Sequence, residues 1–137
     1  MALWGRLYST VWLAFFTCVL IPRWLPLQVG LYVHIILGLA MLAMTSANMA
    51  QLRALPVPDR LKRISKATAG FALFQFIIGL VLGSSTIFAP RWHIVASIIR
   101  GVHVVCGLAM LAQASSVATG YDMWEEKEFE TKPEAKE

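Results

Sequence analysis

Charged residues are scarce in this sequence, and acidic residues are absent from most of it. Lys, Arg, Asp and Glu together make up 15% of the 137 residues, where about 25% is usual for a soluble domain. The apolar class AVILMFWYC takes 58%. A soluble fold of this length has too little interior to bury so many apolar side chains. The composition therefore excludes a water-soluble globular enzyme and a disordered chain, and it predicts an integral membrane protein.

Cysteine and the common nucleotide-binding and catalytic motifs are also rare or missing. The two cysteines, Cys18 and Cys106, lie in apolar stretches and form no CxxC pair, so they indicate no disulfide framework. The sequence has no P-loop, no GxGxxG motif and no Ser-His-Asp arrangement.

Four apolar runs are present, at about 7–21, 26–50, 67–89 and 94–118. A helix needs about 20 residues to cross the hydrocarbon, and in lipid its backbone groups must be satisfied within the segment. The first run is short, but residues 2–4 extend it past Arg6, whose long side chain can reach the headgroups. We therefore predict an all-α fold, a four-transmembrane-helix bundle over residues 1–120.

The charges that are present predict the orientation. All eight acidic residues are Asp59 or lie within 122–137, and five of the twelve basic residues lie within 53–66. Basic loops stay on the cytoplasmic side, so residues 51–66 and both termini are expected there, with Trp24 and Trp92 at the outer interface. We expect residues 121–137 to form a charged, solvated cytoplasmic tail. The pattern is that of a multi-pass protein of a prokaryotic plasma membrane and not of a nucleic-acid-binding face.

An internal repeat relates the two halves of the chain. Residues 33–43 read VHIILGLAMLA and residues 102–112 read VHVVCGLAMLA, identical at eight of eleven positions. A Pro-Arg-Trp triplet precedes each copy, at 22–24 and 90–92. This repeat predicts two tandem helical hairpins of the same orientation, related by a pseudo-two-fold axis along the membrane normal.

The repeat places His34 and His103 at matching depth, facing each other across the bundle. An ionisable side chain within a span is costly and indicates function. Two opposed imidazoles suit the axial positions of a haem iron, so we predict one bis-histidine haem b. Polar packing between helices is the alternative for either histidine. Zinc or copper is disfavoured because two histidines leave such a metal short of ligands.

Three further residues are predicted to belong to the haem site. Gly38 and Gly107 each lie one helical turn from a histidine, where a missing side chain lets a flat macrocycle approach the backbone. Arg100 lies one turn outward from His103 and would pair with a haem propionate, with Arg23 or Arg91 as helpers. His93 is expected at the outer surface.

Other intramembrane residues are expected to pack helices. Met41 and Met110 match each other in the repeat and fill the core. Gly79 and Gly83 form a GxxxG pair typical of close helix contacts. Gln75 is expected to hydrogen-bond across helices near the inner side.

The placement of His34 and His103, with Gly38 and Gly107, resembles a single four-helix half of a haem A synthase. The likeness covers residues 7–118 and implies a b-type haem between helices two and four. Haem A synthases also resemble one another in an outer acidic residue and in an Arg beside a His. Here no acidic residue lies in a span or outer loop, and Ile35 and Val104 follow the histidines.

These features favour a membrane b-type cytochrome that carries electrons as a subunit of a larger oxidoreductase or respiratory complex, more than a stand-alone enzyme. Its partners would be other membrane subunits, a second copy or a quinone, whose reduced quinol form would donate electrons. One alternative is a haem-modifying enzyme of the haem A synthase type. The other is a cofactor-free structural subunit of a membrane complex.

Overall fold

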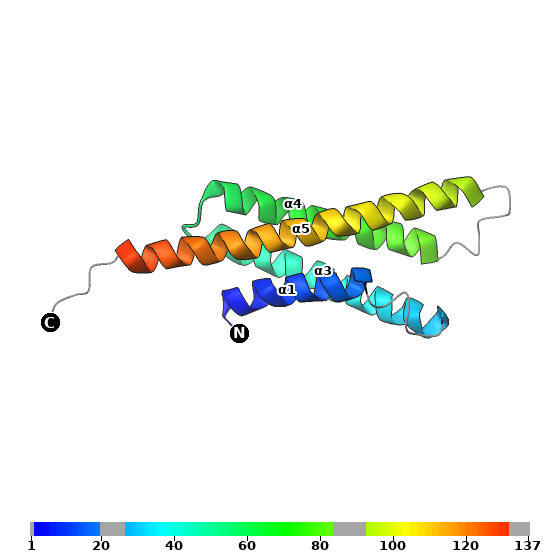
Figure 1. The fold of residues 1–137 in the computed structure, drawn as a ribbon, viewed down its shortest axis with the longest axis horizontal. Coiled ribbons are helices and arrows are strands. Elements are labelled where there is room, and N and C mark those ends of the chain that lie inside the picture. The colour runs from blue at the N-terminus through cyan, green and yellow to red at the C-terminus, as the bar shows by residue number, and fades with distance from the viewer. Residues whose placement is uncertain (1, 20–26, 84–92, 132–137) are drawn as a thin grey trace.

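The computed structural model describes residues 2–19, 27–83 and 93–131, and these residues form four helices (Figure 1). The helices are α1 (Leu3–Val19), α3 (Leu27–Ala54), α4 (Asp59–Gly83) and α5 (His93–Thr131). The described part of the chain contains no strand. The predicted all-α class is therefore confirmed.

Three of these helices are long and apolar enough to cross a membrane, namely α3, α4 and α5. Each carries large apolar side chains that are exposed, including Ile36 on α3, Ile77 on α4 and Val105 on α5. Contiguous exposed apolar surface of this kind is rare on soluble monomers and is typical of lipid-facing helices. α1 has 17 described residues and is not among the three.

The helices extend further than the apolar runs at the end where α3 connects to α4. α3 continues to Ala54 and α4 begins at Asp59, so the connection of 55–58 is shorter than the predicted 51–66. Pro56 and Pro58 interrupt the helix here. The Pro58 carbonyl accepts hydrogen bonds from the backbone N–H groups of Leu61 and Lys62, and Asp59 places a carboxylate in the first turn of α4.

The end of α5 differs from the expected tail. The helix continues through Thr131, so residues 121–131 are helical, and residues 132–137 lie outside the described part. Tyr121 is buried in a core cluster with residues of the other helices, and its ring centroid lies 5.6 Å from that of Trp124. These aromatic side chains pack the start of the segment into the bundle, whereas Glu126, Lys127 and Glu128 are exposed and the end of α5 projects past the other helices (Figure 1).

The four helices pack in a ring in which α3 and α5 lie on a diagonal. α1 contacts both α3 and α5, and α4 contacts the same two helices. The start of α1 and the end of α5 lie at the same end of the bundle as the 55–58 connection (Figure 1); we call this the loop end. Midway along the bundle, one buried residue from each helix forms a cluster: Ala14, Met41, Ala72 and Met110. The expected core role of Met41 and Met110 is thus confirmed.

A polar network ties α1 to α3 near the loop end. The Arg6 Nε donates to the Asn48 Oδ1 at 2.6 Å, and its Nη2 donates to the Gln51 Oε1. The Asn48 Nδ2 in turn donates to the Thr10 hydroxyl at 2.9 Å. The sequence suggested that the Arg6 side chain reaches the headgroups. In the structure its guanidinium instead bonds to the neighbouring helix α3. Buried polar groups of this kind fix helix pairing because leaving one of them unpaired is costly.

Candidate functional site

His34 of α3 and His103 of α5 face each other across the diagonal of the bundle. Their ring centroids lie 6.0 Å apart and the ring planes make an angle of 59°. Both side chains are half-buried. The structure therefore brings together the two histidines that the repeat singled out.

The two imidazoles line a cavity between the helices. It encloses about 970 Å³ free of protein atoms, counting its open mouth, and the centre of a water molecule can reach about 200 Å³ of it. Gly38 and Gly107 also line the cavity, as predicted from their spacing to the histidines. The remaining lining is mostly apolar and comes from all four helices: Thr17, Cys18, Leu31, Ile35, Ala72, Gln75, Phe76, Gly79, Leu80, Val104, Leu108 and Met110.

The glycines of the cavity are not equivalent. A Cβ on Gly107 would lie 2.9 Å from the Gln75 Nε2 and 3.3 Å from the Cys18 Sγ, so only glycine fits there without a shift. A Cβ on Gly38 would lie 3.6 Å from Phe76, an ordinary contact. Gly79 lies against the His103 ring, where a Cβ would come within 3.4 Å of the Cε1. One member of the GxxxG pair thus packs against an imidazole of the site.

Gln75 belongs to the site, although the sequence predicted for it only a hydrogen bond between helices. Its side chain is 9% exposed and lines the cavity, and its Nε2 donates a hydrogen bond to the His103 backbone carbonyl at 2.7 Å. Its Oε1 is buried and has no hydrogen-bond partner among the residues that the structure describes, and the same is true of the His103 Nδ1. A signal was present in the sequence, since Gln75 is the one amide in the apolar run 67–89.

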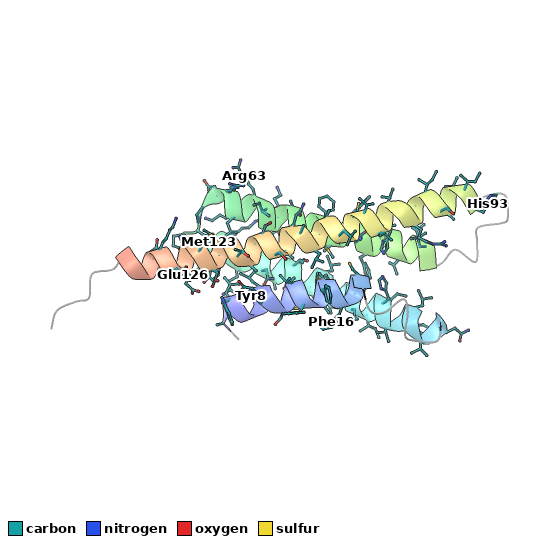
Figure 2. All side chains as sticks on the ribbon, in the orientation of Figure 1. Tyr8, Phe16, Arg63, His93, Met123 and Glu126 are labelled. Carbon is teal, nitrogen blue, oxygen red and sulfur yellow. The ribbon has the colours of Figure 1, made fainter. Side chains whose placement is uncertain are left out.

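Other predicted residues lie apart from the cavity. Arg100 is exposed on α5 and does not line it, and no Lys or Arg among the described residues does. His93 is exposed at the start of α5, at the opposite end of that helix from Met123 and Glu126 (Figure 2). The proposed helpers Arg23 and Arg91, and the interfacial Trp24 and Trp92, lie outside the described residues.

Among residues 2–19, 27–83 and 93–131, no group of three or more His, Cys, Asp or Glu side chains is placed to hold a metal ion. The two imidazoles are the nitrogen ligands that the described histidines bring to the cavity. Comparison of the chain with models of known families, with curated proteins and with solved structures found no match.

Proposed function

We propose that this chain is a membrane b-type cytochrome that binds one haem b between His34 and His103. The observation that carries the proposal is the 6.0 Å separation of the two ring centroids. A metal–imidazole bond is about 2 Å long and a ring centroid lies about 1 Å from its own nitrogens, so one iron between two imidazoles separates the centroids by about 6 Å. Two imidazoles bound to one iron can take any angle between their ring planes. The observed angle of 59° is therefore compatible with this arrangement.

The cavity has the chemistry that a haem requires. Its lining is mostly apolar with a few polar side chains, which is the composition usual for a ligand site. A porphyrin supplies four nitrogens itself, so two histidines complete its iron, whereas a bare zinc or copper ion would lack ligands. When bound, the haem would supply reversible one-electron transfer, and two histidines filling its axial positions favour that role over oxygen chemistry.

The orientation belongs to the same proposal. We place the loop end in the cytoplasm because Arg53, Arg60, Lys62, Arg63 and Lys66 gather there. We take α1 as the fourth span, because it packs along α3 and α5 and exposes Trp12, Phe15 and Phe16.

Matched contacts support the pseudo-two-fold axis between the two hairpins. In the cluster midway along the bundle, Met41 and Met110 are repeat equivalents and meet between the two hairpins. Diagonal placement of α3 and α5 is what such an axis requires.

The proposed role is transfer of electrons within a larger membrane oxidoreductase. The described chain is a helical bundle, so its electrons would come from other membrane subunits, a second copy of the chain or a quinol. Exposed apolar faces on α3, α4 and α5 suit contact with lipid and with such partners equally.

A visible spectrum of the purified full-length chain tests this function. A bis-histidine haem b gives sharp reduced bands and a low-spin ferric signal, and acid extraction returns unmodified haem b. A chain purified from haem-replete cells without these bands, and unable to take up added haem, would be the cofactor-free subunit. Extraction of a chemically modified haem would instead identify the haem-modifying enzyme.

Arg100 tests the propionate assignment. We expect Arg100→Leu to weaken haem retention or to lower the midpoint potential, because a cation near the iron favours the reduced form with its smaller positive charge. Redox titration of the purified variant measures the shift. Arg60→Leu, which removes an exposed arginine at the loop end, is the control. Equal potential and occupancy in Arg100→Leu and wild type would show that Arg100 does not pair with the haem.

A further inference from the structure

We propose that Gln75 controls the tautomer of His103. The buried amide of Gln75 accepts a hydrogen bond from His103 and so fixes the tautomer that carries hydrogen on Nδ1. The other ring nitrogen, Nε2, is then the one that ligates iron. The inference extends the proposed haem site by naming a residue that positions one of its ligands. It rests on contacts within the protein that are present whether or not a haem is bound.

Two buried atoms in this region lack hydrogen-bond partners among the described residues, the Gln75 Oε1 and the His103 Nδ1. The amide oxygen is an acceptor, and Nδ1 is a donor in one neutral tautomer of imidazole. Each unpaired buried group costs about 1–3 kcal/mol, so the state in which these two atoms pair is favoured over one that leaves both unpaired.

Gln75 already contacts the residue from whose ring N–H it would accept a hydrogen bond. Its Nε2 already donates to the backbone carbonyl of His103 at 2.7 Å, so the amide is anchored to the residue whose ring it would contact. Gly107 leaves the room that the amide occupies, because a Cβ there would lie 2.9 Å from the same Nε2. A ligating histidine commonly donates its other ring N–H to an oxygen acceptor, which fixes the tautomer and the ring orientation.

The arrangement is specific to one of the two histidines. Besides Gln75, the histidines and Cys18, the polar side chain that lines the described cavity is that of Thr17 on α1. Its hydroxyl donates to the Leu13 carbonyl of its own helix at 2.7 Å. We therefore expect changes at Gln75 to act on His103 and not on His34.

The test uses three variants of the full-length chain: Gln75→Leu, Gln75→Glu and Gln113→Leu. Leucine removes both the donor and the acceptor of the amide. A protonated Glu keeps one donor for the carbonyl and one acceptor for Nδ1, so it should restore the wild-type state. Gln113 is a half-buried amide on α5 that accepts a hydrogen bond from Thr68 and does not line the cavity, so Gln113→Leu is the matched control.

The first readout needs no haem. Long-range ¹H–¹⁵N spectra of haem-free, ¹⁵N-histidine-labelled protein in detergent report the tautomer of each imidazole. We expect His103 to carry hydrogen on Nδ1 in wild type, in Gln75→Glu and in Gln113→Leu, and we expect its tautomer ratio to fall about tenfold in Gln75→Leu. A wild-type His103 with hydrogen on Nε2, or an unchanged ratio in Gln75→Leu, would overturn the inference.

The second readout uses the haem-loaded protein. Loss of the acceptor makes the imidazole a weaker electron donor to iron, so Gln75→Leu should raise the midpoint potential while Gln113→Leu leaves it unchanged. An unchanged potential in Gln75→Leu counts against control of the bound ligand. If no variant and no wild-type protein binds haem, the proposed function fails, and the tautomer measurement still decides the role of Gln75.

Discussion

Replacing either histidine of the facing pair should abolish the bis-histidine haem spectrum. Loss of an outer-shell partner of a ligand already costs about 10- to 100-fold in metal affinity, so we expect His34→Ala or His103→Ala, which remove a ligand itself, to weaken haem binding by at least about 100-fold. The effect follows from the geometry, because the rings lie 6.0 Å apart and no third histidine lines the cavity. Haem content per polypeptide and the reduced spectrum after purification measure it.

His93→Ala is the matched control for these variants. His93 is exposed at the start of α5 and does not line the cavity, so its removal should leave haem content and spectrum unchanged. Far-ultraviolet circular dichroism and a single gel-filtration peak establish that each variant remains helical and folded. A normal spectrum in both His34→Ala and His103→Ala would refute the ligand assignment.

A methyl group at Gly107 should destabilise the protein, whereas the same change at Gly101 of α5 should not. Gly→Ala within a helix usually stabilises it by up to about 1 kcal/mol, because alanine has the better helix propensity. At Gly107 the new Cβ would lie 2.9 Å from the Gln75 Nε2, which must shift, and we expect the shift to break its bond to the His103 carbonyl. The loss of that buried bond costs about 1–3 kcal/mol, so the sign of the substitution reverses.

Gly101→Ala provides the comparison on the same helix. A Cβ on Gly101 meets no atom within 4 Å, so this variant should unfold at or above the wild-type temperature. Thermal unfolding in detergent, followed by circular dichroism, should place Gly107→Ala below wild type, and haem content should fall with it. Equal unfolding temperatures for the two variants would mean that Gly107 is not held in close contact with Gln75.

Much of the architecture follows from local features of the sequence. Apolar runs and the absence of charge within them predicted an all-helical chain, because a backbone in lipid must satisfy its own hydrogen bonds. The repeated VH…GLAMLA segment put His34 and His103 at one level, and helical spacing put Gly38 and Gly107 beside them. The structure contains these features because each of them depends only on residue spacing within one helix and within its repeat.

The boundaries of the helices were less predictable. Hydropathy marks where a chain leaves lipid and not where a helix ends, so α3 and α4 extend into the connection that charge marked as a loop. Similarly, α5 continues to Thr131, and its Tyr121 lies buried among residues of the other helices although charge marked this segment as a tail. Both differences arise from contacts that polar composition does not report.

The sequence by itself determined the helical class, the duplication and the pairing of two imidazoles, since all three follow from spacing along the chain. Only the tertiary structure decided that Gln75, Gly79 and Cys18 join the cavity and that Arg100 stands outside it. The helices are apolar on nearly every side, so the pattern does not tell which face of a helix meets its neighbours and which meets lipid. The rotation of each helix about its own axis is set by packing against the others, and that rotation selects the residues around His34 and His103.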